Sequence, residues 1–371
     1  MRVVVIGAGI VGAALAARLA EAGVEVVLVD AGTPGGGTSR TSLAWLNANQ
    51  KLPRAYFDLN VEGMRAWQRL AAEFGNPPWY VPTGNLAWAE TDAANEELHA
   101  RVERLRDWGY AAELLTDRQV SELEPGLRLP LGAEVAFFPG EGFAHAARAV
   151  ESLVTRATTA GATVVTDDPV VDFSTEGGRV TAARLASGAA ITGDAFACCA
   201  GWRTPDLAAL LGVTVPLVPP SAPGSKAPCL TAMTGPVTPS LGRVVHAPHV
   251  HARPTEGGGV WLEDAHAQVD LTTPADQLDQ AAGELLRRGA QILPALADGH
   301  VRDARLCVRP LPVDGYPIVG WCRQIEGFYL AVTHSGVTLA ARLAQLVTDE
   351  IAGGRRAEAL EPYRLDRFQS P

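Results

Sequence analysis

The six residues from Gly7 to Gly12 constrain the fold of this chain more than any other segment. Their sequence is Gly-Ala-Gly-Ile-Val-Gly, and they lie between the apolar run 2–6 and the alanine- and leucine-rich segment 13–22. A short continuous apolar run is typical of a parallel strand that is buried on both faces. We therefore predict a β–α–β unit over residues 2–30, with the glycine-rich turn between its first strand and its helix.

Each glycine of this turn has a physical task in dinucleotide binding. Gly7 allows the tight turn, Gly9 lets the backbone approach a pyrophosphate, and Gly12 permits close packing of the helix against the strand. The phosphates then lie at the helix N-terminus, where free N–H groups and the helix dipole attract an anion. Asp30 follows the second strand and is placed to bind ribose hydroxyls, which argues against a cofactor with a 2′-phosphate. The alternative is a glycine turn in an unrelated α/β unit.

The segment 35–42, Gly-Gly-Gly-Thr-Ser-Arg-Thr-Ser, follows soon after Asp30. Its backbone amides, hydroxyls and guanidinium suit a second contact with a pyrophosphate. A flexible surface loop has the same composition, so that alternative stays open. FAD and NAD share the fingerprint, and the glycines alone do not choose between them.

Nucleotide-binding signals occur at the start, in the middle and at the end of the chain, which indicates a discontinuous domain. The Pro-, Gly- and Ser-rich segment 216–228 is typical of a crossing between domains. We predict an α/β fold in which a Rossmann-like nucleotide domain carries an inserted α+β domain built on a mainly antiparallel sheet. The predicted domains are residues 1–45, 141–216 and 301–371 for the first, and residues 46–140 and 217–300 for the second.

Local patterns predict the elements of these domains. Helical periodicity covers 58–74, 92–108, 143–160, 274–290 and 337–351. Strands are expected at 162–173 and 179–186, joined by a turn at Gly177-Gly178, at 195–200, within 229–265, and near 301–309 and 327–332.

Composition excludes several classes of protein. The net charge of −10 argues against a general nucleic-acid surface, because phosphate binding needs a basic face. The five cysteines form no CxxC pair, so we predict neither a disulfide framework nor a zinc site. The N-terminus begins in a strand instead of a signal peptide, and no uninterrupted run of 18 apolar residues occurs. We expect a cytoplasmic protein with no membrane span.

Three separated blocks resemble the D-amino-acid-oxidase-like flavoproteins, a family that includes glycine oxidase, sarcosine oxidase and bacterial D-amino-acid dehydrogenase. The blocks are the fingerprint with its Gly-Thr-Ser loop, Ala200-Gly201-Trp202, and the pair 309–315 (Arg-Pro-Leu-Pro-Val-Asp-Gly) and 333–338 (Thr-His-Ser-Gly-Val-Thr). Their order and spacing span nearly the whole chain, although residues 77–140 match no motif. The resemblance implies that the nucleotide domain binds FAD and that the inserted domain binds substrate.

The resemblance also assigns roles to residues. It places adenosine contacts on Asp30 and Val170, pyrophosphate contacts on the fingerprint and its second loop, and the middle block beside the flavin. Residues 336–338 open the last helix, whose N–H groups would stabilise the negative charge of reduced flavin. The predicted cofactor-binding residues are Gly7, Gly9, Ile10, Val11, Gly12, Asp30, Ala31, Thr38, Ser39, Val170, Ala200, Gly201, Trp202, Gly336, Val337 and Thr338.

Arg309 is the first catalytic-pocket candidate. In glycine oxidase and its relatives, an Arg five residues before an Asp-Gly turn pairs with the substrate carboxylate, and Arg309 lies five residues before Asp314. A planar guanidinium can grip a carboxylate with two hydrogen bonds and fix the substrate over the flavin. A structural Arg paired with a core carboxylate is the alternative.

Two further positions are compared with sarcosine oxidase, where a Cys holds the flavin covalently and a Lys lies over it. Cys307 matches the position of that Cys, but a buried strand cysteine is also common, so we favour non-covalent FAD and leave the covalent link open. The nearest counterpart of the Lys is Trp261, which weakens the case for a fast oxidase. Lys51 could supply this charge, contact substrate, or be a surface lysine.

The histidines offer one more candidate. His334 precedes the last helix and is expected near the flavin ring, with a capping or packing role as the alternative. His249 and His251 alternate in the sequence and could line the pocket together, near His246. No cysteine is nearby, so no metal site is predicted.

These residues predict oxidation of an amine or amino acid at its C–N bond, with hydride transfer to flavin N5 and an imine as product. Arg309, His334 and Lys51 are the predicted catalytic residues. The alternatives are dehydrogenation of a hydroxy acid or a biosynthetic tailoring oxidation on the same fold, and a non-catalytic nucleotide-binding or interaction protein. The expected partner is a small amine or amino acid, with no nucleic acid; a homodimer is left open.

Overall fold

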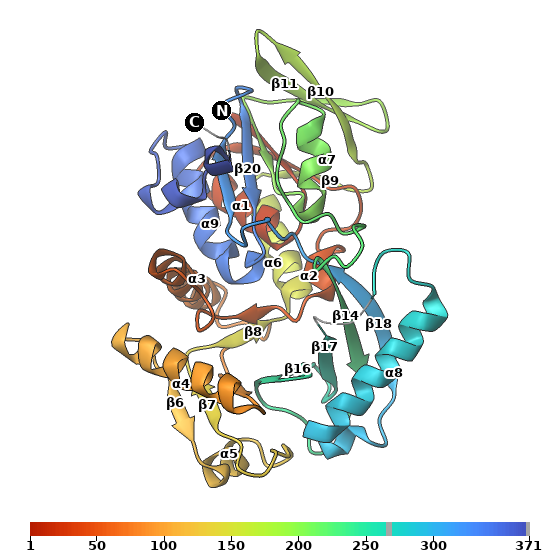
Figure 1. The fold of residues 1–371 in the computed structure, drawn as a ribbon. Coiled ribbons are helices and arrows are strands. Elements are labelled where there is room, and N and C mark those ends of the chain that lie inside the picture. Colours follow the sequence, from red (N-terminus) through yellow and green to blue (C-terminus); the bar gives the residue numbers. More distant parts are fainter. Residues whose placement is uncertain (265–268, 369–371) are drawn as a thin grey trace.

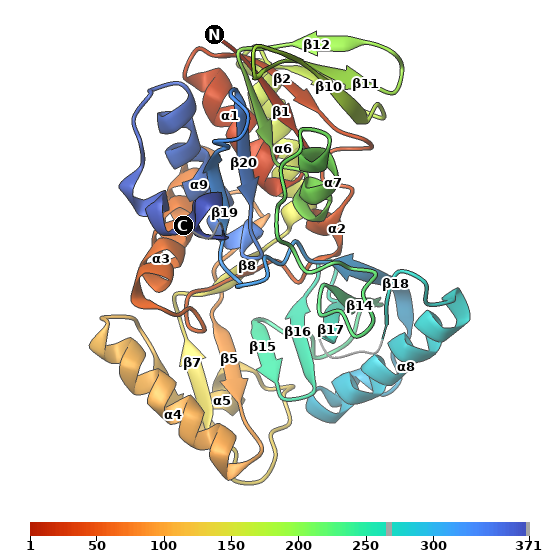
Figure 2. The ribbon, with the colours of Figure 1, turned by 45° about the horizontal axis from the view of Figure 1, so that its top comes forward.

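The computed structural model describes residues 1–264 and 269–368, and its first layer is a six-stranded sheet (Figures 1 and 2). The strand order is β19-β20-β13-β1-β2-β9. All neighbours are parallel except β19 and β20, which are antiparallel. The strands are β1 (Arg2–Ile6), β2 (Glu25–Val29), β9 (Thr163–Val165), β13 (Ala195–Cys198), β19 (Ile318–Trp321) and β20 (Phe328–Val332).

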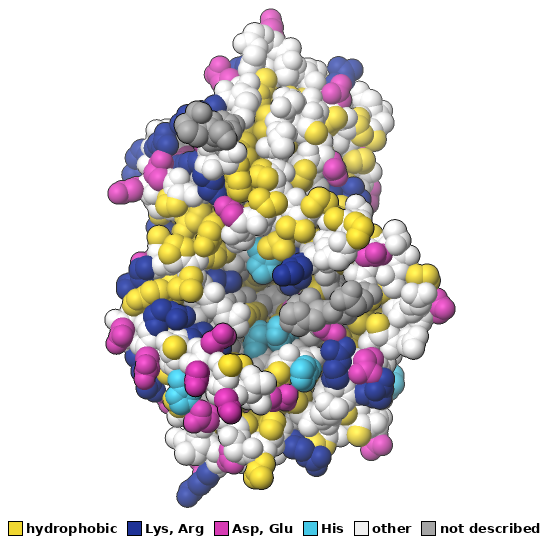
Figure 3. Space-filling model, viewed as in Figure 1, with side chains coloured by type: hydrophobic (Ala, Val, Ile, Leu, Met, Phe, Trp, Pro, Cys, Tyr) yellow, Lys and Arg dark blue, Asp and Glu magenta, His cyan; other side chains and the backbone are white. Residues whose placement is uncertain are grey.

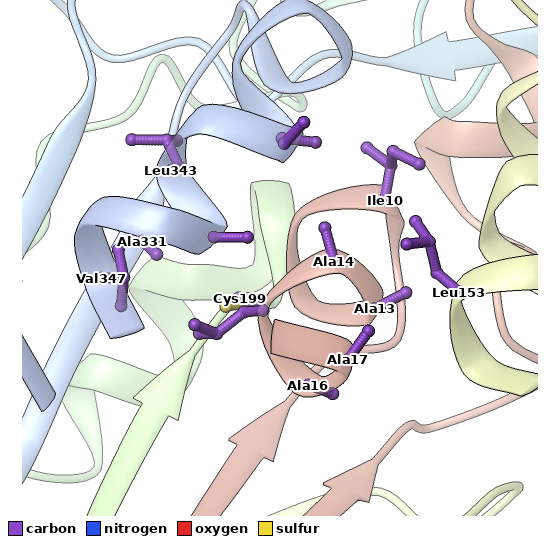
Figure 4. Packing of buried hydrophobic residues seen from close by; sticks show 14 of the residues in the cluster. Ile10, Ala13, Ala14, Ala16, Ala17, Leu153, Cys199, Ala331, Leu343 and Val347 are labelled. Carbon is purple, nitrogen blue, oxygen red and sulfur yellow. The ribbon is translucent and has the colours of Figure 1, made fainter. Parts of the chain in front are cut away.

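Helices cover one face of this sheet, and a smaller sheet covers the other. On the first face, α1 (Ile10–Glu21) lies between α6 (Ala146–Thr159) and α9 (Gly336–Ile351). Alanines such as Ala13, Ala14 and Ala17 form the surface of α1 that meets its neighbours, and their small side chains let the helices approach closely (Figure 4). The other face is covered by the sheet of β10 (Val170–Glu176), β11 (Arg179–Leu185) and β12 (Ala190–Thr192), and by α7 (Thr204–Ala209).

The second large sheet has eight strands and lies in the lower half of Figure 2. Its order is β18-β14-β17-β16-β15-β5-β7-β6, and every neighbouring pair is antiparallel except β15 with β5. The predicted mainly antiparallel sheet is therefore confirmed. Its strands are β5 (Asn85–Trp88), β6 (Glu113–Leu115), β7 (Val135–Phe138), β14 (Pro228–Thr234), β15 (Val244–Ala247), β16 (Val250–Pro254), β17 (Val260–Asp264) and β18 (Val301–Val308).

The remaining elements flank or connect the two large sheets. Helix α8 (Ala275–Ile292) packs on the eight-stranded sheet, while α4 (Asp92–Asp107) and α5 (Asp117–Leu123) lie beside its other end. A three-stranded sheet of β3 (Trp45–Leu46), β8 (Gly142–Ala144) and β4 (Tyr80–Val81) lies between the two halves, with α2 (Thr38–Thr41) and α3 (Arg54–Glu73) nearby. Short 3-10 helices cover Gly201–Arg203, Pro294–Leu296, Glu358–Tyr363 and Leu365–Phe368.

One predicted boundary is wrong. Residues 301–308 are expected in the nucleotide domain, but they form β18, which pairs with β14 of the eight-stranded sheet. An alternating strand sequence does not say which sheet the strand joins, because that depends on its partner. The helix expected from residue 143 begins at Ala146, since 142–144 form β8. The other proposed domain boundaries stay predictions.

Other local predictions are confirmed. Gly177 and Gly178 join β10 to β11 in a turn with φ of +57° and +80°, a conformation that glycine adopts readily. The helices predicted at 92–108 and 337–351 are α4 and α9, each within one residue of the expected ends. Among the described helices, none is both long enough and apolar enough to cross a membrane.

Candidate functional site

A cavity of about 770 Å³ lies between the two large sheets. This volume is within the range of about 300–1,000 Å³ that is usual for small-molecule and cofactor sites. On the side of the six-stranded sheet, its walls come from five segments, within 6–11, 29–51, 169–170, 199–207 and 331–338. On the other side they come from strands β15 to β18 of the eight-stranded sheet and the residues that follow β18. Figure 3 shows a hollow in the surface at this level, with histidine side chains around it.

The fingerprint glycines are fixed by close backbone contacts. Gly7 has a φ of +101°, and a Cβ there would lie 2.6 Å from the carbonyl oxygen of Cys199. A Cβ on Gly12 would lie only 1.8 Å from the carbonyl oxygen of Gly7. Gly12 therefore lets α1 approach the turn and does not line the cavity, which corrects its prediction as a cofactor-binding residue.

Asp30 and the second loop complete this end of the cavity. The Asp30 carboxylate accepts hydrogen bonds from Ala8 N at 2.6 Å and Gly32 N at 2.9 Å, and it lines the cavity. Ser39 Oγ accepts a hydrogen bond from Ile10 N at 3.0 Å, at the first turn of α1. Thr38 Oγ1 donates to Val308 O at 2.6 Å. The segment is therefore a fixed wall that joins the fingerprint to the eight-stranded sheet, and the alternative of a flexible surface loop is wrong.

The other nucleotide-domain predictions converge on the same cavity. The first turn of α9 lies against β3, because Thr338 Oγ1 donates to Trp45 O at 3.1 Å and accepts from Asn47 N at 3.3 Å. The cavity is lined by all the predicted cofactor-binding residues except Gly12, namely Gly7, Gly9, Ile10, Val11, Asp30, Ala31, Thr38, Ser39, Val170, Ala200, Gly201, Trp202, Gly336, Val337 and Thr338.

At the end of the cavity nearest the eight-stranded sheet, three ionisable residues form a row, and the sequence predicted only His251 among them as a pocket-lining residue. His246 on β15 pairs with His251 on β16, and His251 pairs with Glu263 on β17. The two imidazole centroids are 4.4 Å apart, and His251 Nδ1 lies 3.6 Å from Glu263 Oε1. Directly opposite residues in neighbouring strands point to the same face, so the row faces the cavity together.

The prediction for His249 is wrong. It lies in the two-residue turn between β15 and β16, is exposed, and has its Nε2 3.2 Å from Glu90 Oε2. The two-residue turn makes His246, and not His249, the cross-strand neighbour of His251. That hairpin spacing is the signal that could have found the pair from the sequence.

Burial and neighbouring charges set the protonation of His246 and Glu263. Burial lowers the pKa of His246 well below its ordinary value, and His251 and Lys51 add to this shift. Burial works against ionisation of Glu263, but His251 and Arg309 outweigh it and lower the pKa of its carboxyl. The cavity therefore presents a neutral imidazole and a carboxylate, both of which accept hydrogen bonds.

The tautomer of His246 follows from its neighbours. Asn85 Nδ2 donates to Glu141 Oε2 at 3.3 Å, which leaves Asn85 Oδ1 to accept from His246 Nδ1 at 2.8 Å. The indole of Trp45 packs against the imidazole, with centroids 3.8 Å apart. Nδ1 therefore carries the proton, and Nε2 is the acceptor of this ring.

Arg309 lines the cavity as predicted. Its guanidinium donates to the backbone carbonyls of Lys226 and Ala227, the latter at 3.4 Å from Nε. No carboxylate in the described part of the chain lies within ion-pair distance of it, so the alternative of a structural Arg paired with a core carboxylate is not supported. These two carbonyls fix the orientation of the guanidinium, and its Nη1 has no hydrogen-bond partner among the described residues.

Lys51 and His334 also line the cavity. Burial lowers the pKa of Lys51 to about 8, although the charge of Glu141 opposes this shift. His334 is exposed because it faces the cavity, yet the surrounding protein, with Lys51 and Arg309, lowers its pKa to about 3. At neutral pH Lys51 is mainly a cation and His334 is neutral. Lys51 is therefore not the surface lysine that composition left open.

Two positions taken from sarcosine oxidase have different surroundings here. Trp261 does not line the cavity; its ring packs against the buried guanidinium of Arg253, with the carbon 4.6 Å from the centroid. Cys307 lines the cavity and is buried, and it pairs across the strands with Cys229, whose Sγ donates to Cys307 O at 3.5 Å. Among residues 1–264 and 269–368 there is no group of three or more His, Cys, Asp or Glu that could hold a metal ion.

Comparison with known proteins agrees with this geometry. A family model described as FAD dependent oxidoreductase (DAO) matches residues 2–350. The chain is 25% identical to glycine oxidase of Geobacillus kaustophilus, covering 98% of this chain and 96% of that one. It is 27% identical to an opine oxidase subunit of Agrobacterium tumefaciens, covering 99% and 97%. The crystal structure of the Geobacillus glycine oxidase superimposes with a TM-score of 0.86 at 22% identity, over the whole of both chains. The protein belongs to the DAO family of FAD-dependent oxidoreductases.

Proposed function

We propose that this protein oxidises the C–N bond of an amine that carries a carboxylate, and that Arg309 binds this carboxylate. The observation that carries the proposal is the position of Arg309, a carbonyl-held guanidinium in the same cavity as the dinucleotide fingerprint. A guanidinium in this state is fixed in orientation before substrate arrives, which reduces the entropic cost of binding.

The cavity residues fit FAD. Gly7 and Gly9 bring bare backbone to the N-terminus of α1, and Ser39 Oγ occupies only the N–H of Ile10, so the other free N–H groups of this turn can bind a pyrophosphate. The carboxylate of Asp30 retains acceptor capacity for ribose hydroxyls. When bound, FAD supplies the acceptor for a hydride from the carbon beside the substrate nitrogen. We propose that it is held without a covalent bond, so that acid precipitation of the protein should release all of the flavin.

The chain's own residues bind and orient the substrate. Arg309 fixes the carboxylate, while His246 Nε2 and Glu263 offer acceptors for the N–H groups of the amine. The first turn of α9, from Gly336, favours negative charge at its end of the cavity. Relatives support a carboxylate-bearing amine, since several are named glycine oxidase and one is named as part of an opine oxidase.

The experiment is an anaerobic titration of the purified FAD-loaded protein with amino acids, N-methyl amino acids and 2-hydroxy acids. We expect amines with a carboxylate to bleach the flavin absorbance. Arg309→Met should lower kcat/KM about 10- to 100-fold, the range for losing a hydrogen bond to a charged group. Arg302→Met is the control, because Arg302 lies on β18, the strand that ends just before Arg309, but is exposed and outside the cavity.

Two results would contradict the proposal. Bleaching by 2-hydroxy acids alone would favour dehydrogenation of a hydroxy acid. Unchanged kcat/KM in Arg309→Met would remove the carboxylate contact.

A further inference from the structure

Lys51 is a cation inside the cavity that has no partner among the described residues. Its ammonium makes neither a hydrogen bond nor an ion pair with them, and it lies over the ring of Tyr56, with Nζ 5.8 Å from the centroid. An ammonium taken out of water without a partner is costly, and its pKa of about 8 reflects that burial. Such a group is expected to meet an anion that the protein itself does not supply.

Glu141 does not fill this role, although it is the anion that acts on Lys51. It is buried, and six hydrogen bonds occupy its two oxygens. The donors are Trp45 Nε1, Ala48 N, Asn49 N, Asn49 Nδ2, Asn85 Nδ2 and Tyr110 OH, at 2.7–3.3 Å. Its acceptor capacity is used in fixing the segment that leads to Lys51.

Lys51 and Arg309 lie at different places around the same space. Both lower the pKa of His334, so both are near that ring. Lys51 also acts on His246 of β15, whereas Arg309 acts on Glu263 of β17. Lys51 follows β3 and Arg309 follows β18, so the two cations reach the cavity from different elements.

The row of His246, His251 and Glu263 in the same cavity suits a nitrogen. His246 Nε2 and Glu263 accept hydrogen bonds, and Glu263 is the one carboxylate among the described lining residues at this end of the cavity. Lys51 and Arg309 each keep hydrogen-bond donors without an acceptor among the described residues. A substrate with two carboxylates satisfies both cations, whereas a substrate with one carboxylate leaves one of them without a partner.

We propose that the substrate is an amine with two carboxylates, one held by Arg309 and the other by Lys51, with its nitrogen facing the row of His246, His251 and Glu263. This inference rests on the proposed function and adds the second carboxylate to it. The ligand class is defined by its chemistry: a small amino- or iminodicarboxylate.

The test is a binding titration that needs no turnover. Oxydiacetate and methoxyacetate differ by one carboxylate and contain no oxidisable amine. The flavin spectrum of the FAD-loaded protein reports their Kd values. We expect oxydiacetate to bind at least tenfold more tightly to the wild type, Lys51→Met to abolish that preference, and Lys51→Arg to keep it. Arg118→Met, an exposed cation on α5, should bind both like the wild type.

Each failure points to a different claim. Equal Kd values for the two ligands in the wild type would overturn the second carboxylate site even if Lys51→Met did not fold. If Lys51→Met kept the preference and slowed only reoxidation of the flavin by oxygen, Lys51 would serve the electron acceptor instead. The proposed function fails separately, if no carboxylate-bearing amine bleaches the flavin anaerobically. If monocarboxylate amines bleach it with kcat/KM equal to that of dicarboxylates, the function stands and this inference is overturned.

Discussion

The absence of a side chain at Gly12 allows α1 to pack against the fingerprint turn. An alanine Cβ at this position would meet the Gly7 carbonyl oxygen at 1.8 Å, and neither backbone can move without displacing α1 or β1. We expect Gly12→Ala to lower the free energy of unfolding by more than about 3 kcal/mol, the upper end of ordinary overpacking. Urea unfolding followed by circular dichroism measures this.

Gly283 is the matched control for that substitution. It lies within α8, and a Cβ there would contact nothing within 4 Å. Gly283→Ala should therefore raise stability by about 0.5–1 kcal/mol, as expected for alanine in a helix. Equal effects of the two substitutions would refute the packing role of Gly12.

Lys51 predicts a pH dependence of dicarboxylate binding. Its charged form binds the anion, and its pKa of about 8 means that this form is lost as the pH rises through 8. The groups that act on it or lie against it are Glu141, His246, His334 and Tyr56. Binding of oxydiacetate should therefore weaken, with its Kd rising about tenfold from pH 7 to pH 9. The Kd of methoxyacetate should stay nearly constant, and a parallel change in both would exclude Lys51 as the cause.

Sequence alone was sufficient for residues whose task is defined by backbone geometry. The fingerprint glycines and Asp30 were predictable because the turn, the helix N-terminus and the strand end are local features. His246 and Glu263 were not, because each becomes part of the site only through cross-strand pairing with His251. Pairing joins residues that are distant in the sequence, and strand patterns do not specify the partner.

At the scale of elements, Glu141, immediately before β8, holds three segments together by hydrogen bonds. Its buried carboxylate accepts hydrogen bonds from residues 45–49, from Asn85 of β5 and from Tyr110. Glu141→Gln replaces one acceptor oxygen by an NH₂ group that faces donors. At least one buried donor then loses its acceptor, and each such loss lowers the free energy of unfolding by about 1–3 kcal/mol.

We expect Glu141→Gln to lower the free energy of unfolding by about 3 kcal/mol and to weaken binding of oxydiacetate. Chemical denaturation and the flavin titration measure the two effects. Glu134→Gln, an exposed carboxylate near β7, is the control. Wild-type stability in Glu141→Gln would show that the hydrogen bonds to this carboxylate contribute little.

Element boundaries were predictable where a local signal ends the element. The glycine turn fixed the hairpin of β10 and β11, and the ends of α4 and α9 were found to within a residue. The assignment of β18 failed for a different reason. Its sequence predicts a strand, but its place beside β14 is determined by tertiary packing, and it then carries Cys307 and Arg309 to the cavity.

At the scale of the whole molecule, the cavity wall is shared by the two large sheets. Thr38 joins the nucleotide side to β18, and Thr338 joins α9 to β3. A ligand that fills this cavity binds the native state and not the unfolded chain, so it must stabilise the fold. FAD at about 100 times its Kd should add about 2.7 kcal/mol to the free energy of unfolding.

Thermal unfolding of the FAD-free protein, with and without added cofactor, checks this stabilisation. FAD should raise the Tm, and NAD at the same concentration should leave it unchanged. A rise with NAD alone would contradict the assignment of the cavity.

The most direct test of the central claim is the anaerobic spectrum of the FAD-loaded protein during addition of a carboxylate-bearing amine. We predict that the flavin absorbance bleaches in the wild type and that Arg309→Met needs about 10- to 100-fold more substrate for the same rate. A flavin that stays oxidised with every such amine, but bleaches with 2-hydroxy acids, would contradict the claim.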